Sequence, residues 1–202
     1  MSEAEKVAPA VSQEVIDYVF TNARTHHGFL PKEVPDSLLQ EIYNICKWGP
    51  NAFNAFPIRI VFVKSAEGKE KLKGTLMEGN IRQTMEAPVT AIIGYDLDFK
   101  EKLDFLSPGY PAKAVFESMP ALIEPTAKLN SGILGAYFII AARMKGLDVG
   151  PMTGFNNEAV DKAFFEGTNV KSLFMVNLGY GDTSKLYPRA PRLDFEDACK
   201  LV

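Results

Sequence analysis

Histidine and cysteine, the usual residues of metal sites and of nucleophilic catalysis, are scarce in this sequence. His26 and His27 are adjacent, so they cannot share one face of a helix, and no acidic or cysteine partner lies near them. Cys46 falls on the apolar face of an expected helix, where a thiol usually acts as a small hydrophobe. The GxSxG, P-loop, HExxH and GxGxxG motifs are also missing. We therefore expect no metal site and no protein nucleophile.

Polar residues gather instead at the ends of the expected helices and strands. The groups are Arg24, Thr25 and His27; Asn51 and Asn54; Asn80 and Gln83; the segment 150–154; and Arg189 and Arg192. Taken singly, each of these residues is explained as a helix cap or a turn residue. Their occurrence together, next to several apolar elements, indicates a site that is assembled from distant parts of the chain.

Charge and composition narrow the choice of partners. The chain has 202 residues, a formal net charge of -3 and 47% hydrophobic residues, so it can bury a sizeable core and carries no broad cationic field. We therefore expect no nucleic acid and no membrane surface as a partner. The two cysteines are far apart without a CxxC pattern, which suits a reducing cytoplasm.

Short apolar runs and helical periodicity predict the elements that position these polar groups. Strands are expected at 58–63, 89–95 and 172–180, and helices at 12–23, 36–46, 67–78, 130–145 and 156–165. The segment 97–120 is irregular, and its aromatic residues have few places to be buried within one small domain, which indicates a partner surface. We expect a flexible arm at 1–10 and one domain at 11–202. Widely separated strands among more numerous helices predict an α+β sandwich.

The joint pattern of these residues resembles the nitroreductase-type flavin oxidoreductase family. The matching segments are 23–29, 47–50 with Asn54 and Pro57, 79–80, 87–92, 146–155, 177–182 and 191–193. The resemblance extends from about Phe20 to the end of the chain. Within the family, the sequence is most similar to the branch that contains malonic semialdehyde reductase.

The resemblance implies a three-layer sandwich with a mostly antiparallel central sheet flanked by helices, and a homodimer that binds FMN at the subunit interface. It implies that Arg24, Thr25 and Arg192 hold the phosphate and ribityl chain, with help from Arg189, and that Asn80 contacts the pyrimidine edge of the ring. Backbone groups near Gly154 are implied to lie beside flavin N5, where glycine permits close approach. The implied cofactor-binding residues are Arg24, Thr25, His26, His27, Pro50, Asn51, Ala52, Asn54, Asn80, Gln83, Pro151, Met152, Thr153, Gly154, Arg189 and Arg192.

The sequence departs from the family pattern at two places. Gln83 stands where relatives often carry lysine, so a neutral donor replaces a cation near N1 and O2 of the ring, which leaves the redox potential open. Phe53 and Phe56 stand where the malonic semialdehyde branch has smaller or polar residues. This extra aromatic volume either reshapes the substrate slot or fills the core.

Three functions remain open at this point. The resemblance implies that NADPH or NADH reduces FMN at N5 and that a small acceptor then takes the hydride in its place, with malonic semialdehyde reduced to 3-hydroxypropanoate. A broad nitroaromatic or quinone reductase would use the same flavin with flatter acceptors. A flavin-binding carrier without enzymatic turnover is the third possibility, and the neutral Gln83 is the residue that keeps it open.

Overall fold

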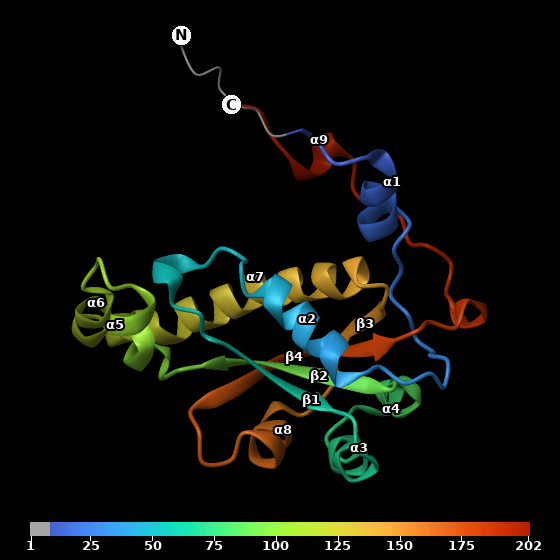
Figure 1. The fold of residues 1–202 in the computed structure, drawn as a ribbon, viewed down its shortest axis with the longest axis horizontal. Coiled ribbons are helices and arrows are strands. Elements are labelled where there is room, and N and C mark those ends of the chain that lie inside the picture. The colour runs from blue at the N-terminus through green and yellow to red at the C-terminus, as the bar shows by residue number, and fades with distance from the viewer. Residues whose placement is uncertain (1–8) are drawn as a thin grey trace.

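An antiparallel sheet forms the centre of the computed structural model, which describes residues 9–202 (Figure 1). Its strands are β1 Ile58–Val63, β2 Val89–Asp96, β3 Asp148–Met152 and β4 Val170–Gly179, in the spatial order β1-β2-β4-β3. The central strands β2 and β4 consist largely of buried residues, because helices cover both of their faces. The expected strands at 58–63, 89–95 and 172–180 are therefore confirmed.

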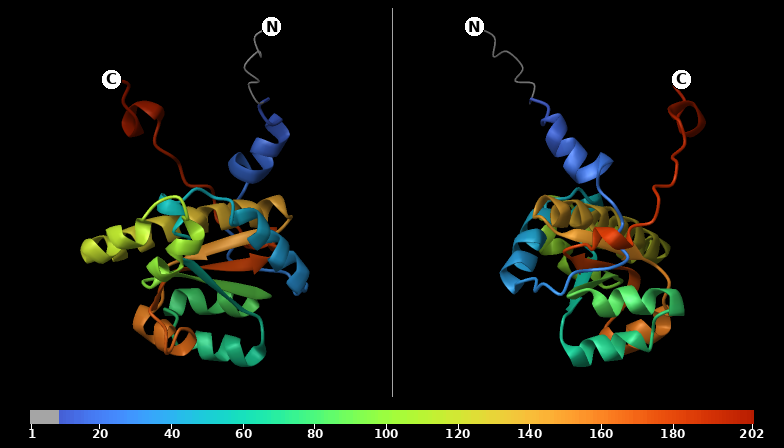
Figure 2. Two further views of the ribbon diagram at one scale, coloured as in Figure 1. Left: turned by 60° about the vertical axis from the view of Figure 1, so that its left-hand side comes forward. Right: turned by 90° about the vertical axis from the view of Figure 1, so that its right-hand side faces the viewer.

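Helices on both sides of the sheet give three layers (Figures 1 and 2). The helices are α1 Gln13–Ile16, α2 Asp36–Cys46, α3 Ala66–Lys73, α4 Glu78–Glu86, α5 Leu103–Leu106, α6 Ala112–Ser118, α7 Ile123–Met144, α8 Asn157–Phe164 and α9 Phe195–Ala198. The shorter helical turns are η1 Asp17–Thr21, η2 Ala52–Asn54, η3 Phe99–Lys102, η4 Pro120–Leu122 and η5 Thr183–Lys185. α2 and α7 lie on one face of the sheet, and α3 and α8 lie on the other. The expected α+β sandwich is thus confirmed.

Two apolar clusters hold the layers together. Under α2 and α7, Ile42, Leu134 and Phe138 are fully buried against the sheet. Under α3 and α8, Leu72 and Val160 are fully buried against its other face. Each fully buried side chain of this size contributes about 1.5–3 kcal/mol to folding. The sheet is consequently a firm support for residues placed at the ends of its strands.

Two of the elements that were not predicted, α4 and β3, carry residues of the expected site. The helix expected at 67–78 ends at Lys73, and a separate helix, α4, carries Asn80 and Gln83. α4 has few apolar residues, so its periodicity is weak in the sequence. The strand β3 contains Gly150 and Pro151, which are poor strand formers, but β3 lies at the edge of the sheet, where proline is tolerated.

The expectation for the segment 97–120 was wrong in part. Phe99, Leu103 and Phe116 are buried in a third cluster with Tyr95, under short helices that the sequence pattern did not indicate. Phe105 and Tyr110 do remain exposed. The segment therefore builds its own small core and leaves only part of its aromatic surface open.

Both ends of the described chain extend away from the body (Figure 2). The predicted helix at 12–23 is capped by Ser12 and changes from α1 into a π-helical turn at Asp17–Thr21. Leu193 and Phe195, near the other end, are exposed. The predicted flexible arm at 1–10 lies mostly outside the described residues. Among the described helices, none is both long and apolar enough to cross a membrane.

Candidate functional site

Four arginines line one cavity of about 600 Å³ beside the first residues that follow η1. They are Arg24, Arg143, Arg189 and Arg192, and Thr25, His27 and Tyr187 also line this cavity. None of its lining residues within the described chain is acidic. A cavity with this lining favours an anion, and the paired donors of guanidinium groups match a phosphate. We call this space the arginine cavity.

The arginine cavity is formed by two segments that lie far apart in the sequence. The Arg24 guanidinium donates to the Tyr187 carbonyl, and Arg189 donates to the Ala23 carbonyl at 3.1 Å. The first segment is also fixed to the sheet, because Thr25 pairs with Val149 of β3 and the His26 amide donates to the Val149 carbonyl at 3.0 Å. Strand β3 thus sets the position of Arg24, Thr25 and His27.

A chain of hydrogen bonds leads from the arginine cavity along α4. Gln83 Nε2 donates to Asn80 Oδ1 at 2.6 Å, and Asn80 Nδ2 donates to the Gly154 carbonyl at 2.9 Å. The free Gln83 Oε1 then faces His27 Nδ1 at 2.7 Å, so the proton of this bond belongs to the histidine. We call His27, Gln83, Asn80 and Gly154 the carboxamide chain. It offers amide donors and acceptors of the kind that recognise the edge of a polar ring.

Glycine is required at one position of the carboxamide chain. A Cβ atom on Gly154 would lie 2.3 Å from Asn80 Nδ2, which is closer than atoms can approach. Any larger residue would displace the Asn80 amide from its place. The Asn80 amide therefore occupies the space that a side chain at position 154 would take.

The predicted residues at the end of β3 have different environments. Met152 is buried, and its sulfur lies 3.8 Å from Gln83 Nε2 and 3.5 Å from Thr84 Oγ1. Pro151 and Thr153 line a separate recess of about 460 Å³ together with Lys128. Met152 also borders this recess, but its sulfur lies behind the carboxamide chain.

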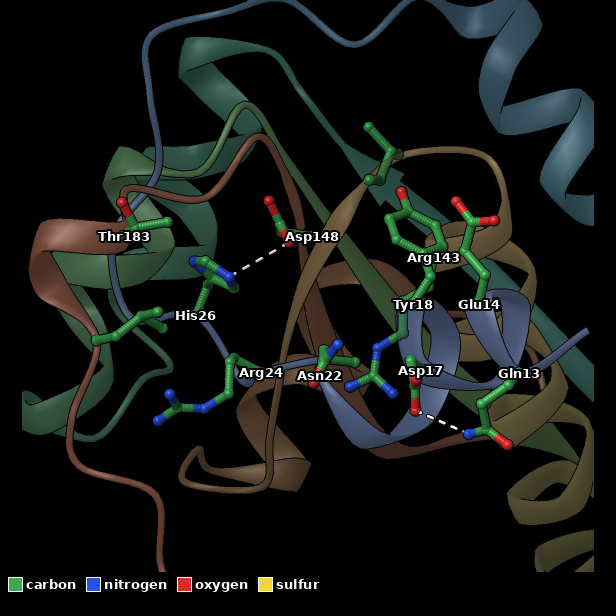
Figure 3. Close-up of a pocket in the computed structure, with 13 residues that line it drawn as sticks. Gln13, Glu14, Asp17, Tyr18, Asn22, Arg24, His26, Arg143, Asp148 and Thr183 are labelled. Carbon is green, nitrogen blue, oxygen red and sulfur yellow. Dashed lines mark hydrogen bonds and ion pairs between the residues drawn. The ribbon is translucent and has the colours of Figure 1, made fainter.

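His26 faces a second cavity, of about 820 Å³, which Figure 3 shows. Its ring is buried, and Nε2 lies 3.3 Å from Asp148 Oδ1; this hydrogen bond lowers the pKa of Asp148. Asp17 and Glu14 also line this cavity, together with Arg24 and Arg143. Carboxylates oppose a phosphate here, so this cavity is less suited to an anion than the arginine cavity. The His26 side chain is not among the groups that line the arginine cavity.

The loop that follows α2 lies away from the arginine cavity, against α7 and the end of α5. The Ala52 amide donates to Asn130 Oδ1 of α7 at 2.7 Å, and Asn54 Nδ2 donates to the Leu106 carbonyl at 2.7 Å. Asn130 and Arg143 are about 20 Å apart along α7, at roughly 1.5 Å per residue. Pro50, Asn51, Ala52 and Asn54 are therefore not brought to the arginine cavity of the same chain.

The same loop has an unusual backbone. Phe53, Asn54 and Phe56 adopt positive φ angles of 57°, 51° and 45°. This conformation is costly for residues other than glycine and persists where the surrounding structure enforces it. Asn51 supplies part of that support, because its Oδ1 accepts the Phe56 amide at 2.8 Å.

Among the lining residues of the arginine cavity that sequence reasoning missed, Arg143 and Tyr187 have the largest polar side chains. Arg143 lies in the last turn of α7, where arginine is normally explained by the helix dipole. Tyr187 lies in the C-terminal segment, with its ring 4.8 Å from that of His27. Neither position has a local sequence signal for ligand binding. In residues 9–202, no group of three or more histidine, cysteine, aspartate or glutamate side chains is placed to hold a metal ion.

Comparisons with known proteins identify the family to which this chain belongs. The model of the Nitroreductase family matches residues 21–180, so the chain belongs to this family. A protein from Stenotrophomonas maltophilia strain R551-3, described as "Putative NADH dehydrogenase/NAD(P)H nitroreductase", is 53% identical over 193 residues, which cover 96% of this chain and 98% of the relative.

Solved structures show the same fold. A crystal structure described as a "putative nitroreductase" from Bacillus subtilis superposes with a TM-score of 0.85 at 18% identity, covering 95% of this chain and 100% of the other. A nitroreductase structure from Exiguobacterium sibiricum, described as being in complex with FMN, has a TM-score of 0.78 at 16% identity and covers 96% and 100% of the two chains.

Proposed function

We propose that this member of the nitroreductase family is an NAD(P)H-dependent oxidoreductase that binds FMN, with the phosphate of the cofactor in the arginine cavity. The observation that carries the proposal is the convergence of four guanidinium groups on one cavity that no carboxylate of residues 9–202 lines. The Stenotrophomonas relative is described as acting with NADH or NAD(P)H, and the Exiguobacterium structure contains FMN. A cytoplasmic location, expected from the two free cysteines, belongs to the same proposal.

The residues present fit this cofactor. Arg24, Arg189 and Arg192 hold the phosphate dianion, Thr25 adds a hydroxyl donor, and Arg143 adds a fourth cation. Asn80 and Gln83 present their amides to the polar edge of the ring. The lack of a side chain at Gly154 leaves room for the Asn80 amide. When bound, FMN supplies hydride transfer through N5, first from NAD(P)H and then to the acceptor, while the protein orients the reactants and excludes water.

A homodimer completes this site in the proposal. α7 carries exposed apolar residues at helical spacing, namely Leu129, Ile133, Tyr137 and Met144. Such a stripe on a helix is typical of a surface that a second copy covers. The loop with Asn51 and Asn54 lies along the same helix, so a second copy bound there would bring its own loop toward the cofactor of the first.

Ile133→Glu should convert the protein into a monomer and weaken FMN binding at the same time. A buried, unpaired carboxylate costs several kcal/mol at an interface, which is enough to dissociate a dimer at micromolar concentration. Sedimentation velocity and FMN fluorescence titration measure the two effects. Lys162→Glu, on α8 beneath the other face of the sheet, is the matched control and should change neither. A wild-type protein that sediments as a monomer with bound FMN would contradict the dimer.

The aromatic residues near the loop favour a flat acceptor. Phe53 stacks on Tyr110 with ring centroids 5.7 Å apart, and the two side chains are 40% and 53% exposed. Exposed aromatic faces bind flat, electron-poor molecules such as nitroaromatics and quinones better than a small polar semialdehyde. We therefore place a nitroaromatic or quinone reductase first, and malonic semialdehyde, which the branch resemblance implies, second.

One experiment separates these functions. Purified protein should be yellow, and anaerobic mixing with NADH or NADPH should bleach the absorbance of its flavin. Steady-state turnover is then compared for nitrofuran, menadione and malonic semialdehyde. Faster turnover of the flat acceptors supports the first assignment, whereas selective reduction of the semialdehyde supports the second. A yellow protein that neither reductant bleaches would be a carrier, and a colourless protein that binds no FMN would refute the proposal.

A further inference from the structure

Lys69 of α3 is a buried cation that contacts no carboxylate in the described part of the chain. Its side chain lies beneath the sheet with only 6% of the residue exposed, and among the described residues it forms no ion pair. The ammonium donates to the Thr84 carbonyl at 2.8 Å and to Thr90 Oγ1 at 2.7 Å. Burial lowers the pKa of Lys69 to about 8. A lysine is costly to bury in this way, so its position calls for a specific role.

The hydrogen bonds continue from Lys69 in one direction through the core. Thr90 accepts from the ammonium and donates to Asn177 Oδ1 at 2.7 Å. Asn177 Nδ2 donates to Thr84 Oγ1 at 3.3 Å, and Thr84 donates to the Met152 sulfur at 3.5 Å. The Thr90 and Thr84 hydroxyls each accept one hydrogen bond and donate another. The Lys69 ammonium, as the first donor, therefore fixes the direction of every hydrogen bond that follows. We call these five residues the Lys69 network.

The Lys69 network ends directly behind the carboxamide chain. Thr84 follows Gln83 on α4, and the Met152 sulfur that accepts from Thr84 also lies 3.8 Å from Gln83 Nε2. Lys69 further binds a carbonyl in the last turn of α4, where a positive charge is favourable. The network therefore joins α4, β2, β3 and β4 at the place where Asn80 and Gln83 are presented.

We propose that Lys69 is a positioning residue of the flavin site, which fixes α4 and Met152 behind the carboxamide chain and supplies a positive charge that favours the reduced form of bound FMN. This inference rests on the proposed function. The reduced ring is more negative than the oxidised ring, so a nearby cation binds the reduced form more strongly. Because the Lys69 network is buried and no carboxylate of the described chain pairs with the ammonium, the electric field of this ammonium is weakly screened.

Lys69→Met tests the charge, because methionine is unbranched, apolar and only one atom shorter than lysine. In the FMN-loaded protein, the ratio of affinities for reduced and oxidised FMN should fall about tenfold, which lowers the two-electron midpoint potential by about 30 mV. The potential is measured by equilibration with a reference dye, and FMN affinity by fluorescence titration. Lys69→Arg keeps the charge and should restore most of the potential. Lys73→Met, on the exposed side of the same helix, is the control and should leave both quantities unchanged.

Thr90→Val tests the positioning and keeps the ammonium in place. This variant removes the hydroxyl that links Lys69 to Asn177, so FMN should bind several-fold more weakly while the midpoint potential stays near that of the wild type. If Lys69→Met does not fold, the FMN affinity of Thr90→Val still tests the positioning role. A Lys69→Met protein with the wild-type potential, or a Thr90→Val protein with wild-type FMN affinity, would overturn the inference. A wild-type protein that binds no FMN would instead refute the proposed function.

Discussion

Arg24→Gln should yield a folded protein that purifies almost free of FMN. Arg24 is the arginine that both lines the arginine cavity and holds the C-terminal segment, through its bond to the Tyr187 carbonyl. Glutamine removes the positive charge, so both of the charge-assisted hydrogen bonds that the paired guanidinium donors would make to a phosphate dianion are lost. A charge-assisted hydrogen bond contributes about 1.5–3 kcal/mol, so the loss of two predicts at least about a 100-fold weaker affinity for FMN.

The measurement is a fluorescence titration of the apoprotein with FMN, together with thermal unfolding without the cofactor. Arg82→Gln is the matched control, since Arg82 lies on α4 between Asn80 and Gln83 but is largely exposed and faces Glu86 one turn away. It should bind FMN like the wild type, because an exposed i,i+4 pair contributes only a few tenths of a kcal/mol. Wild-type FMN affinity in Arg24→Gln would place the phosphate outside the arginine cavity.

The strands at the centre of the sheet could be predicted because their sequence signal is local. β2 and β4 are covered on both faces, so most of their residues are apolar. β3 lacks this signal, since Gly150 is required by a neighbouring segment and Pro151 is tolerated only at the sheet edge. The burial of Phe99 and Phe116 could not be predicted from the sequence either, because it depends on packing against Tyr95 and on helices with weak periodicity.

Some residues of the candidate site could be predicted from the sequence, and others could not. The family pattern pointed to Arg24, Thr25 and Arg192, and the fold brings these side chains to one cavity. Arg143 was missed because its role depends on where the last turn of α7 meets distant segments. Asn51 and Asn54 lie far from that cavity within one chain, so their expected contact with FMN requires a second copy, which a single sequence pattern does not place.

Lys69 illustrates a limit of reading charge from a sequence. The segment 67–78 alternates lysine and glutamate, which is typical of an exposed helix with charge pairs on its surface. Lys73 follows this expectation, with Glu70 3.5 Å away. Lys69 does not, because its position on the helix turns it toward Thr84 and Thr90. Only the packing of α3 against the sheet distinguishes the two lysines.

Gly150→Ala should destabilise the protein and weaken FMN binding through a single added methyl group. A Cβ atom at this position would lie 2.5 Å from the His26 carbonyl oxygen, and backbone cannot move aside as a flexible side chain can. The neighbouring bond from the His26 amide to Val149 holds that backbone in place. Overpacking of this kind costs about 1–3 kcal/mol, and the value should lie near the upper end.

The same methyl group acts on the cofactor site because the displaced segment carries Arg24, Thr25 and His27. A shift of a few tenths of an ångström at His26 lengthens every hydrogen bond that these residues make, so we expect FMN affinity to fall at least about tenfold. Urea unfolding and FMN titration measure the two effects on the same preparation. Gly74→Ala is the control, since the nearest atom to its Cβ lies 3.9 Å away. If Gly150→Ala has the wild-type free energy of unfolding but binds FMN more weakly, the segment 24–27 has moved only at the arginine cavity. If both the free energy of unfolding and the FMN affinity are those of the wild type, β3 does not set the position of the arginine cavity.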